Sequence, residues 1–125
     1  MILGIGFDVV AIDRISRSLS AGNGEFERLV FTVAELEACA ARADREQALA
    51  ARFAAKEACF KALGTGWAKG VSFQQVAVAG LEGGRPELRL TGPAAARAQS
   101  LGVRAMHVSL SHDTAVAAAV VVLER

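Results

Sequence analysis

The chain has 125 residues, of which 53% are hydrophobic and 22% are charged, and its formal net charge is +1. This composition is typical of one soluble globular domain and excludes an intrinsically disordered chain. A charge so close to balance gives no overall signal for nucleic acid or a membrane, so any charged site must be local.

Residues 2–10 are predicted to form a strand, because they are apolar and rich in β-branched side chains. Gly4 and Gly6 in this segment would let another backbone or a ligand come close. Strand alternation puts Asp8 on the same side as Gly6, beside the space that the glycine leaves. A strand-end aspartate held by backbone amides is the simpler explanation of Asp8.

Four helices are predicted next, at residues 11–19, 25–30, 33–42 and 45–63. Thr32 and Glu35 have the spacing of a capping box, and Asp44 is a candidate N-cap for the long helix. Gly64 is the expected stop of that helix, because glycine is the preferred residue after a C-cap.

The long helix at 45–63 combines an apolar stripe with charged residues. Four large side chains share the stripe at 3.6 residues per turn: Leu49, Phe53, Phe60 and Leu63. Lys56 lies within the stripe, and Glu57 and Lys61 lie side by side on its flank. Considered alone, the helix is explained by a lysine that extends to solvent and an ordinary surface ion pair.

Gly64, Thr65 and Gly66 open a glycine-rich connection, which suits either a simple exit from the helix or a close approach to a phosphate. The pattern then changes to period two. We predict strands at 73–78 and 87–90 around a turn at 82–85, a helix at 93–101, and a final hairpin of strands at 104–111 and 115–123. This order of elements indicates one α+β domain over residues 1–125.

The segments at the two ends and the cysteines bear on location. Residues 1–12 lack the features of a secretory signal, and the apolar run at 115–123 is far shorter than the roughly 20 residues that span a bilayer. Cys39 and Cys59 do not have the spacing of a metal site, and Cys59 in the long helix is expected to be a buried free thiol. We therefore expect a cytoplasmic protein.

Two carboxylates stand out from apolar surroundings, Asp8 on the first strand and Glu57 on the long helix. If the helix packs on the strand, they repel each other unless a cation lies between them. Mg²⁺ is commonly held by one or two carboxylates, with waters and substrate phosphates as further ligands. Lys61, one turn beyond Glu57, would face the same phosphate. These residues predict a magnesium and phosphate site.

Two motifs in this order resemble the holo-[acyl-carrier-protein] synthase family, the small phosphopantetheinyl transferases. They are the G-x-D element that ends at Asp8, within residues 4–10, and the K-E-x-x-x-K element from Lys56 to Lys61, within residues 53–66. The likeness extends over nearly the whole chain, through residues 26–28, 31–35, 84–86 and 108–113. Either motif alone would be a weak signal, but the pair is specific.

The resemblance implies a reaction. It implies transfer of the 4′-phosphopantetheine arm of coenzyme A to a serine of an apo acyl carrier protein, with release of adenosine 3′,5′-bisphosphate. It further implies Mg²⁺ held by Asp8 and Glu57, assistance by Lys61 at the β-phosphate, and a homotrimer with active sites between subunits. Either Glu57 or a metal-bound water would take the proton of the serine.

The resemblance also places the coenzyme and the carrier. We expect the coenzyme near eight residues: Lys61, Gly64, Thr65, Gly66, Arg85, Pro86 and, from a neighbouring subunit, Ser111 with His112. Arg85 would meet the 3′-phosphate. The acidic carrier is expected on Arg14, Arg17, Phe26 and Arg28. A solvated helix face explains each arginine equally well, and a local turn explains His112. Residues 21–24 lack the basic side chains that family members often carry there, which bears on the strength of carrier recognition.

Two other functions stay open. One is a Mg²⁺-dependent hydrolase of nucleotide pyrophosphates, which would use water in place of the serine. The other is a non-catalytic trimeric scaffold that binds carriers. The complete set of Asp8, Glu57 and Lys61 argues against the scaffold, and the arginines ahead of the site argue for a protein acceptor. The Lys56 side of the long helix is expected to meet a cleft or another subunit, at the coenzyme.

Overall fold

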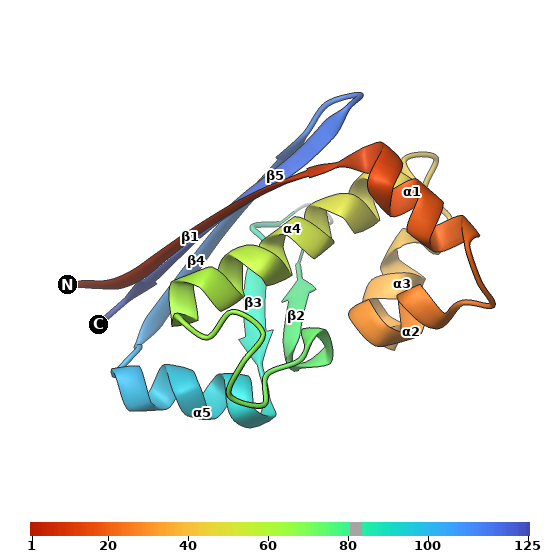
Figure 1. Cartoon of the computed structure of the whole chain (residues 1–125). Coiled ribbons are helices and arrows are strands. Elements are labelled where there is room, and N and C mark those ends of the chain that lie inside the picture. The colour runs from red at the N-terminus through yellow and green to blue at the C-terminus, as the bar shows by residue number, and fades with distance from the viewer. Residues whose placement is uncertain (81–83) are drawn as a thin grey trace.

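The computed structural model describes residues 1–80 and 84–125. An antiparallel sheet in the order β1-β5-β4 forms one layer, and the long helix α4 lies across one face of it (Figure 1). The elements are β1 (Ile2–Ala11), α4 (Arg45–Leu63), β4 (Ala105–His112) and β5 (Val116–Glu124). The predicted α+β fold, with an antiparallel sheet packed on a long helix, is confirmed.

Two glycines allow α4 to lie directly against β1. A Cβ atom added to Gly6 would run into the carbonyl oxygen of Ala58, and one added to Gly4 would run into that of Ala62. The space beside these glycines is therefore filled by the backbone of α4, which is one of the two occupants that the sequence predicts. This close approach determines the distance between the strand that carries Asp8 and the helix that carries Glu57.

The remaining elements surround α4. Near its N-terminal part lie α1 (Ile12–Ser20), α2 (Glu25–Val30) and α3 (Val33–Ala40), and near its C-terminal end lies α5 (Gly92–Leu101) (Figure 1). A short 3₁₀ turn, η1 (Phe73–Gln75), leads into the antiparallel pair β2 (Val76–Ala79) and β3 (Glu87–Leu90). In the part of the chain that the structure describes, no helix is long and apolar enough to span a membrane.

Several local predictions are confirmed. Thr32 and Glu35 form the capping box, with hydrogen bonds of 2.8 and 3.2 Å between side chains and backbone amides. Gly64 ends α4 in the left-handed region at φ 73°. Residues 113–115 connect β4 to β5 in a hairpin, and both cysteines are buried free thiols.

Two local predictions are wrong. Residues 73–75 form η1 and not a strand, because the side chains of Gln74 and Gln75 bond to backbone groups of other segments and hold this stretch in a turn. Asp44 occupies the N-cap position of α4, but its carboxylate binds the Arg42 guanidinium at 2.7 and 2.9 Å in place of the helix amides. The turn predicted at 82–85 falls largely on residues 81–83, outside the described residues.

The prediction that the Lys56 side of α4 meets a cleft or another subunit is also wrong. Lys56 is fully buried inside its own chain, and its Nζ lies 2.8 Å from Glu35 Oε1. It also donates to the carbonyl oxygens of Phe73 at 3.0 Å and Val76 at 2.6 Å. Since these partners satisfy the ammonium, this lysine neither extends to solvent nor faces another subunit.

Candidate active site

The first contact of the site joins β1 to α4. Lys61 Nζ lies 3.1 Å from Asp8 Oδ1 and also donates to the carbonyl oxygen of Phe7 at 2.9 Å. The Lys61 side chain is half-exposed and that of Asp8 is mostly covered. Because the glycines of β1 bring α4 so close, a helix side chain can reach both the backbone and the carboxylate of the strand. The fold thus brings Asp8 and Lys61 together.

Glu57 lies one helical turn before Lys61 and is partly buried. Burial raises the pKa of the Glu57 carboxyl above its usual range, and the negative charge of Asp8 raises it further. The positive charges of Lys61 and Arg14 act on that pKa in the opposite direction. The two carboxylates are therefore close enough to repel each other.

This donor set fits Mg²⁺. In the described part of the chain no group of three or more His, Cys, Asp or Glu side chains forms a metal cage. Mg²⁺ does not need one, because it usually keeps several waters and takes one or two carboxylates together with substrate phosphates. A bound cation would also relieve the repulsion that Glu57 experiences from Asp8. Asp8 and Glu57 are therefore suitable ligands.

The predicted carrier-binding residues lie on the exposed side of α1 and α2. Arg14 is exposed, and its guanidinium lies over the ring of Phe53, 5.6 Å from the centroid. Arg17 forms an exposed ion pair with Asp13 at 3.5 Å, and Arg28 donates to a backbone carbonyl in the preceding loop. Phe26 is half-buried, since it packs against two other phenylalanine rings. Of the predicted arginines, Arg14 is the one whose positive charge acts to lower the pKa of Glu57.

The glycine-rich connection after α4 presents backbone at two positions. Gly64 and Gly66 are exposed, with φ values of 73° and 51° that favour glycine. Thr65 between them is only 6% exposed, and its hydroxyl donates to the carbonyl oxygen of Gly66 at 3.1 Å. Bare backbone at Gly64 and Gly66 is thus the part of this predicted segment that a ligand can reach.

The other predicted coenzyme residues do not meet the acidic pair within one chain. Arg85 and Pro86 line a cavity of about 580 Å³ against β4. Ser111 and His112 line a smaller one, of about 170 Å³, with Ala48 at the start of α4. Ala48 and Glu57 are nine residues apart, two and a half helical turns, so they lie on opposite sides of α4. Strand β5 also separates β4 from β1.

Sequence reasoning missed Arg52, which is 2% exposed on α4. Its Nη1 donates to the carbonyl oxygen of Ala48 at 3.3 Å, while its Nε has no hydrogen-bond partner among the described residues. Burying an unpaired charged group is costly, so this guanidinium is suited to an anionic partner. The signal in the sequence was an arginine within an otherwise apolar or small-residue run.

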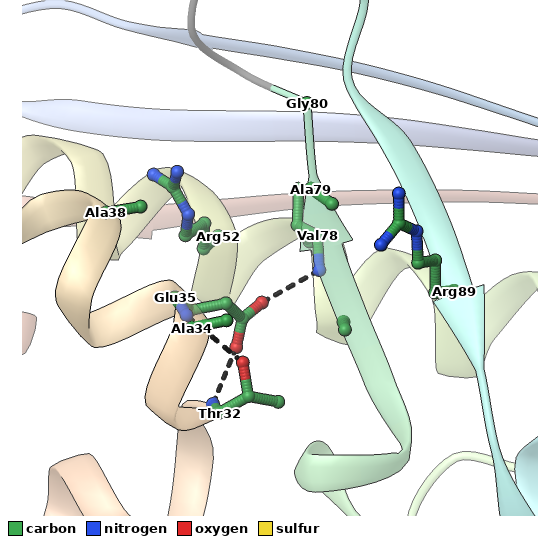
Figure 2. A pocket seen from close by; sticks show the side chains of 10 residues that line it. Thr32, Ala34, Glu35, Ala38, Arg52, Val78, Ala79, Gly80 and Arg89 are labelled. Atoms are coloured by element: carbon green, nitrogen blue, oxygen red, sulfur yellow. Dashed lines mark hydrogen bonds between the residues drawn. The ribbon is translucent and has the colours of Figure 1, made fainter.

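Arg52 borders two cavities. One is the cavity of about 170 Å³ that Ser111 and His112 also line. Figure 2 shows the other, of about 360 Å³, where Arg52 extends between α3 and β2. In that cavity the Glu35 carboxylate turns toward the backbone amides of Thr32 and Val78, both at 2.8 Å. Because those amides and Lys56 occupy the Glu35 carboxylate, Glu35 acts on the positive charge of Arg52 only through space, and burial still lowers the pKa of Arg52.

Comparison with known proteins gives consistent matches over the full chain. A family model described as the 4′-phosphopantetheinyl transferase superfamily matches residues 4–120. The chain is 45% identical over 125 residues to the holo-[acyl-carrier-protein] synthase of Maridesulfovibrio salexigens, with 100% of both proteins covered. It is 49% identical over 128 residues to that of Methylobacterium nodulans, with 99% of this chain and 97% of the relative covered.

Solved structures of the same family superpose on nearly the whole chain. The holo-[acyl-carrier-protein] synthase of Neisseria meningitidis superposes with a TM-score of 0.88 at 35% identity, with 100% of both chains covered. That of Helicobacter pylori, solved in complex with coenzyme A, gives 0.83 at 29% identity over 96% of this chain and 99% of the other.

Proposed function

The chain belongs to the 4′-phosphopantetheinyl transferase superfamily, and from this premise we propose that it is a holo-[acyl-carrier-protein] synthase. In this reaction the serine oxygen of an apo acyl carrier protein attacks the β-phosphorus of coenzyme A. The bond from that phosphorus to the bridging oxygen breaks, the arm moves to the serine, and adenosine 3′,5′-bisphosphate leaves. The observation that carries the proposal is the convergence of Asp8, Glu57 and Lys61 where β1 meets α4.

Each of the three side chains has a role in this proposal. Asp8 and Glu57 would hold Mg²⁺, which would offset negative charge on the pyrophosphate oxygens. Lys61 is held in place by the Phe7 carbonyl and by Asp8, so its ammonium is positioned to stabilise the charge that builds on the leaving bisphosphate. The proton of the serine passes to Glu57 or to a water that Glu57 orients.

We further propose that the active sites lie between the subunits of a homotrimer. The face of the sheet turned away from α4 exposes Ile5, Phe7 and Val9 at 60, 57 and 51%. An apolar patch of this kind is typical of an interaction surface. Assembly through this face would bring Ser111 and His112 of one subunit toward the Asp8 and Glu57 of the next.

In the proposed trimer, we expect arginines to bind the phosphates of the coenzyme. Arg85 and the buried Arg52 are the candidates, because a guanidinium matches phosphate oxygens and Arg52 is incompletely paired. The carrier docks on Arg14, Arg17 and Arg28, opposite its own acidic helix. The reaction is placed in the cytoplasm, where free cysteines such as Cys39 and Cys59 stay reduced.

Mass spectrometry of a carrier protein tests the function. Incubation with coenzyme A, Mg²⁺ and an apo carrier of fatty-acid or polyketide synthesis should add the mass of one phosphopantetheine arm to the carrier. Unmodified carriers together with metal-dependent cleavage of coenzyme A would favour the hydrolase. Unmodified carriers and intact coenzyme A would favour the scaffold.

A further inference from the structure

The only tryptophan of the sequence, Trp67, is 64% exposed although its ring packs on the core. Its ring meets that of the buried Phe73 edge to face, with centroids 4.6 Å apart. It also lies 6.0 Å from the ring of Phe60 on α4. One side of the indole is thus anchored by the protein and the other is open to solvent.

The loop that carries Trp67 has a constrained backbone. Gly66, Lys69 and Gly70 all have positive φ values, of 51°, 63° and 75°. Such values are uncommon for a residue other than glycine. Two backbone hydrogen bonds close turns within the loop, from Ala68 N to the Thr65 carbonyl oxygen at 2.9 Å and from Val71 N to the Ala68 carbonyl oxygen at 3.5 Å. The neighbouring Thr65 is buried. The loop therefore presents Trp67 in a defined place.

Trp67 and Arg14 lie on either side of Glu57. The guanidinium of Arg14 covers the ring of Phe53, and the indole of Trp67 packs on the ring of Phe60. Glu57 is four residues after Phe53 and three before Phe60, so both are its neighbours on the helix surface. Arg14 and Trp67 therefore flank the part of α4 that carries Glu57.

The same surface continues onto α2. The ring of Phe73 under Trp67 lies 5.4 Å from that of Phe53, which in turn lies 6.1 Å from that of Phe26. The side chain of Gln74 bonds to the carbonyl oxygens of Arg28 and Phe31, which ties η1 to the end of α2. The loop and the helices of the predicted carrier surface thus form one packed unit.

The charge of the loop matches an acidic partner. Residues 64–70 contain Lys69 and no acidic residue. Lys69 thus adds a positive charge to the loop that carries Trp67, and Arg14 and Arg28 lie on the helices of the same packed unit. A large aromatic side chain that is already ordered loses little entropy on binding, and tryptophan is enriched among residues that dominate binding energy.

We propose that Trp67 is an anchor for the acyl carrier protein, which packs an apolar side chain of its acidic helix on the indole while Lys69 and Arg14 pair with its carboxylates. This inference rests on the proposed function and adds a specificity-determining residue to it.

Fluorescence of the single tryptophan tests the contact directly. Titration of the protein with apo carrier, with coenzyme A omitted, should shift the Trp67 emission to shorter wavelength and saturate with the carrier. Unchanged emission at carrier concentrations that saturate transfer would overturn the proposal. An equal shift with coenzyme A alone would overturn it too, because it would place Trp67 on the coenzyme's side.

Kinetics separate this proposal from the function on which it rests. Trp67→Ala should raise the KM for carrier about tenfold, with the KM for coenzyme A unchanged, and Trp67→Phe should recover most of the loss. Val33→Ala, which truncates an apolar side chain on α3 that is 72% exposed, is the matched control. If wild-type protein modifies the carrier and Trp67→Ala does so with the same KM, this inference fails while the function stands. If wild-type protein modifies no carrier, the function itself fails.

Discussion

Lys61 pairs with Asp8 at 3.1 Å, although its spacing along α4 makes Glu57 its nearest charged neighbour in the sequence. The lysine thus compensates the strand carboxylate, and Glu57 keeps a pKa raised by burial and by Asp8. The site therefore holds one carboxylate paired with a lysine and a second, Glu57, whose raised pKa favours the binding of a proton.

Asp8→Asn and Glu57→Gln should each reduce transfer by more than about a hundredfold, because each removes an anionic ligand from the proposed magnesium site. The measurement is the rate of arm transfer to a carrier, together with circular dichroism to establish that the fold is retained. Glu37→Gln, on an exposed carboxylate of α3, is the control and should retain full activity. Full activity in either site variant would contradict the metal assignment.

Glu57→Gln should also stabilise the metal-free protein at neutral pH. The pKa of Glu57 in the folded state lies above its ordinary value of 4.5, so the folded protein binds this proton more tightly than the unfolded chain. The associated stability is present below the ordinary pKa and is lost as the pH rises through the raised one. Thermal melts should therefore give the variant a higher Tm at pH 7, and the difference should shrink toward pH 4. Mg²⁺ should stabilise the wild type alone; a Tm difference that is the same at both pH values would contradict this account.

The buried pair of Glu35 and Lys56 allows a test of stability. Lys56→Met leaves Glu35 buried without its counter-ion and should lower the free energy of unfolding by about 3–5 kcal/mol. The double variant Lys56→Met with Glu35→Gln should lose less free energy of unfolding than the two single variants lose together, because the neutral amide needs no cation. Urea unfolding of the four proteins measures this coupling. The exposed pair of Arg89 and Glu87 serves as the comparison and should couple by less than about 1 kcal/mol.

The features that the sequence predicted well depend on residues close together in the chain. Thr32 with Glu35, and Gly64 after the long helix, encode helix ends through local hydrogen bonds and backbone freedom. Asp8 is far from Glu57 and Lys61 in the sequence, but each of the three is a charged residue in an apolar element, and this exception to the pattern pointed to the site.

The features that were missed depend on tertiary contacts. Lys56 looked like a lysine at a cleft because its partner Glu35 lies on another helix, and the carbonyls that it binds belong to a segment that was expected to be a strand. The signal at Arg52 was only an arginine in a run of apolar and small residues, since its incomplete pairing follows from how α3, α4 and β4 surround it. Ser111 and His112 can be connected to Asp8 only through a second subunit.

Phe7→Asp should dissociate the proposed homotrimer into single chains, as measured by light scattering. The Phe7 side chain lies on the exposed face of β1, whereas its carbonyl, which binds Lys61, points into the site and is unchanged by the substitution. Packing three such faces together would bury three carboxylates near one another, which costs far more than the apolar contact that is lost. Val33→Asp introduces the same charge at an apolar position of α3 and should leave the assembly intact. Because Ser111 and His112 would then be missing from each site, the Phe7→Asp chain should also lose transfer, and a monomeric but fully active variant would refute the shared site.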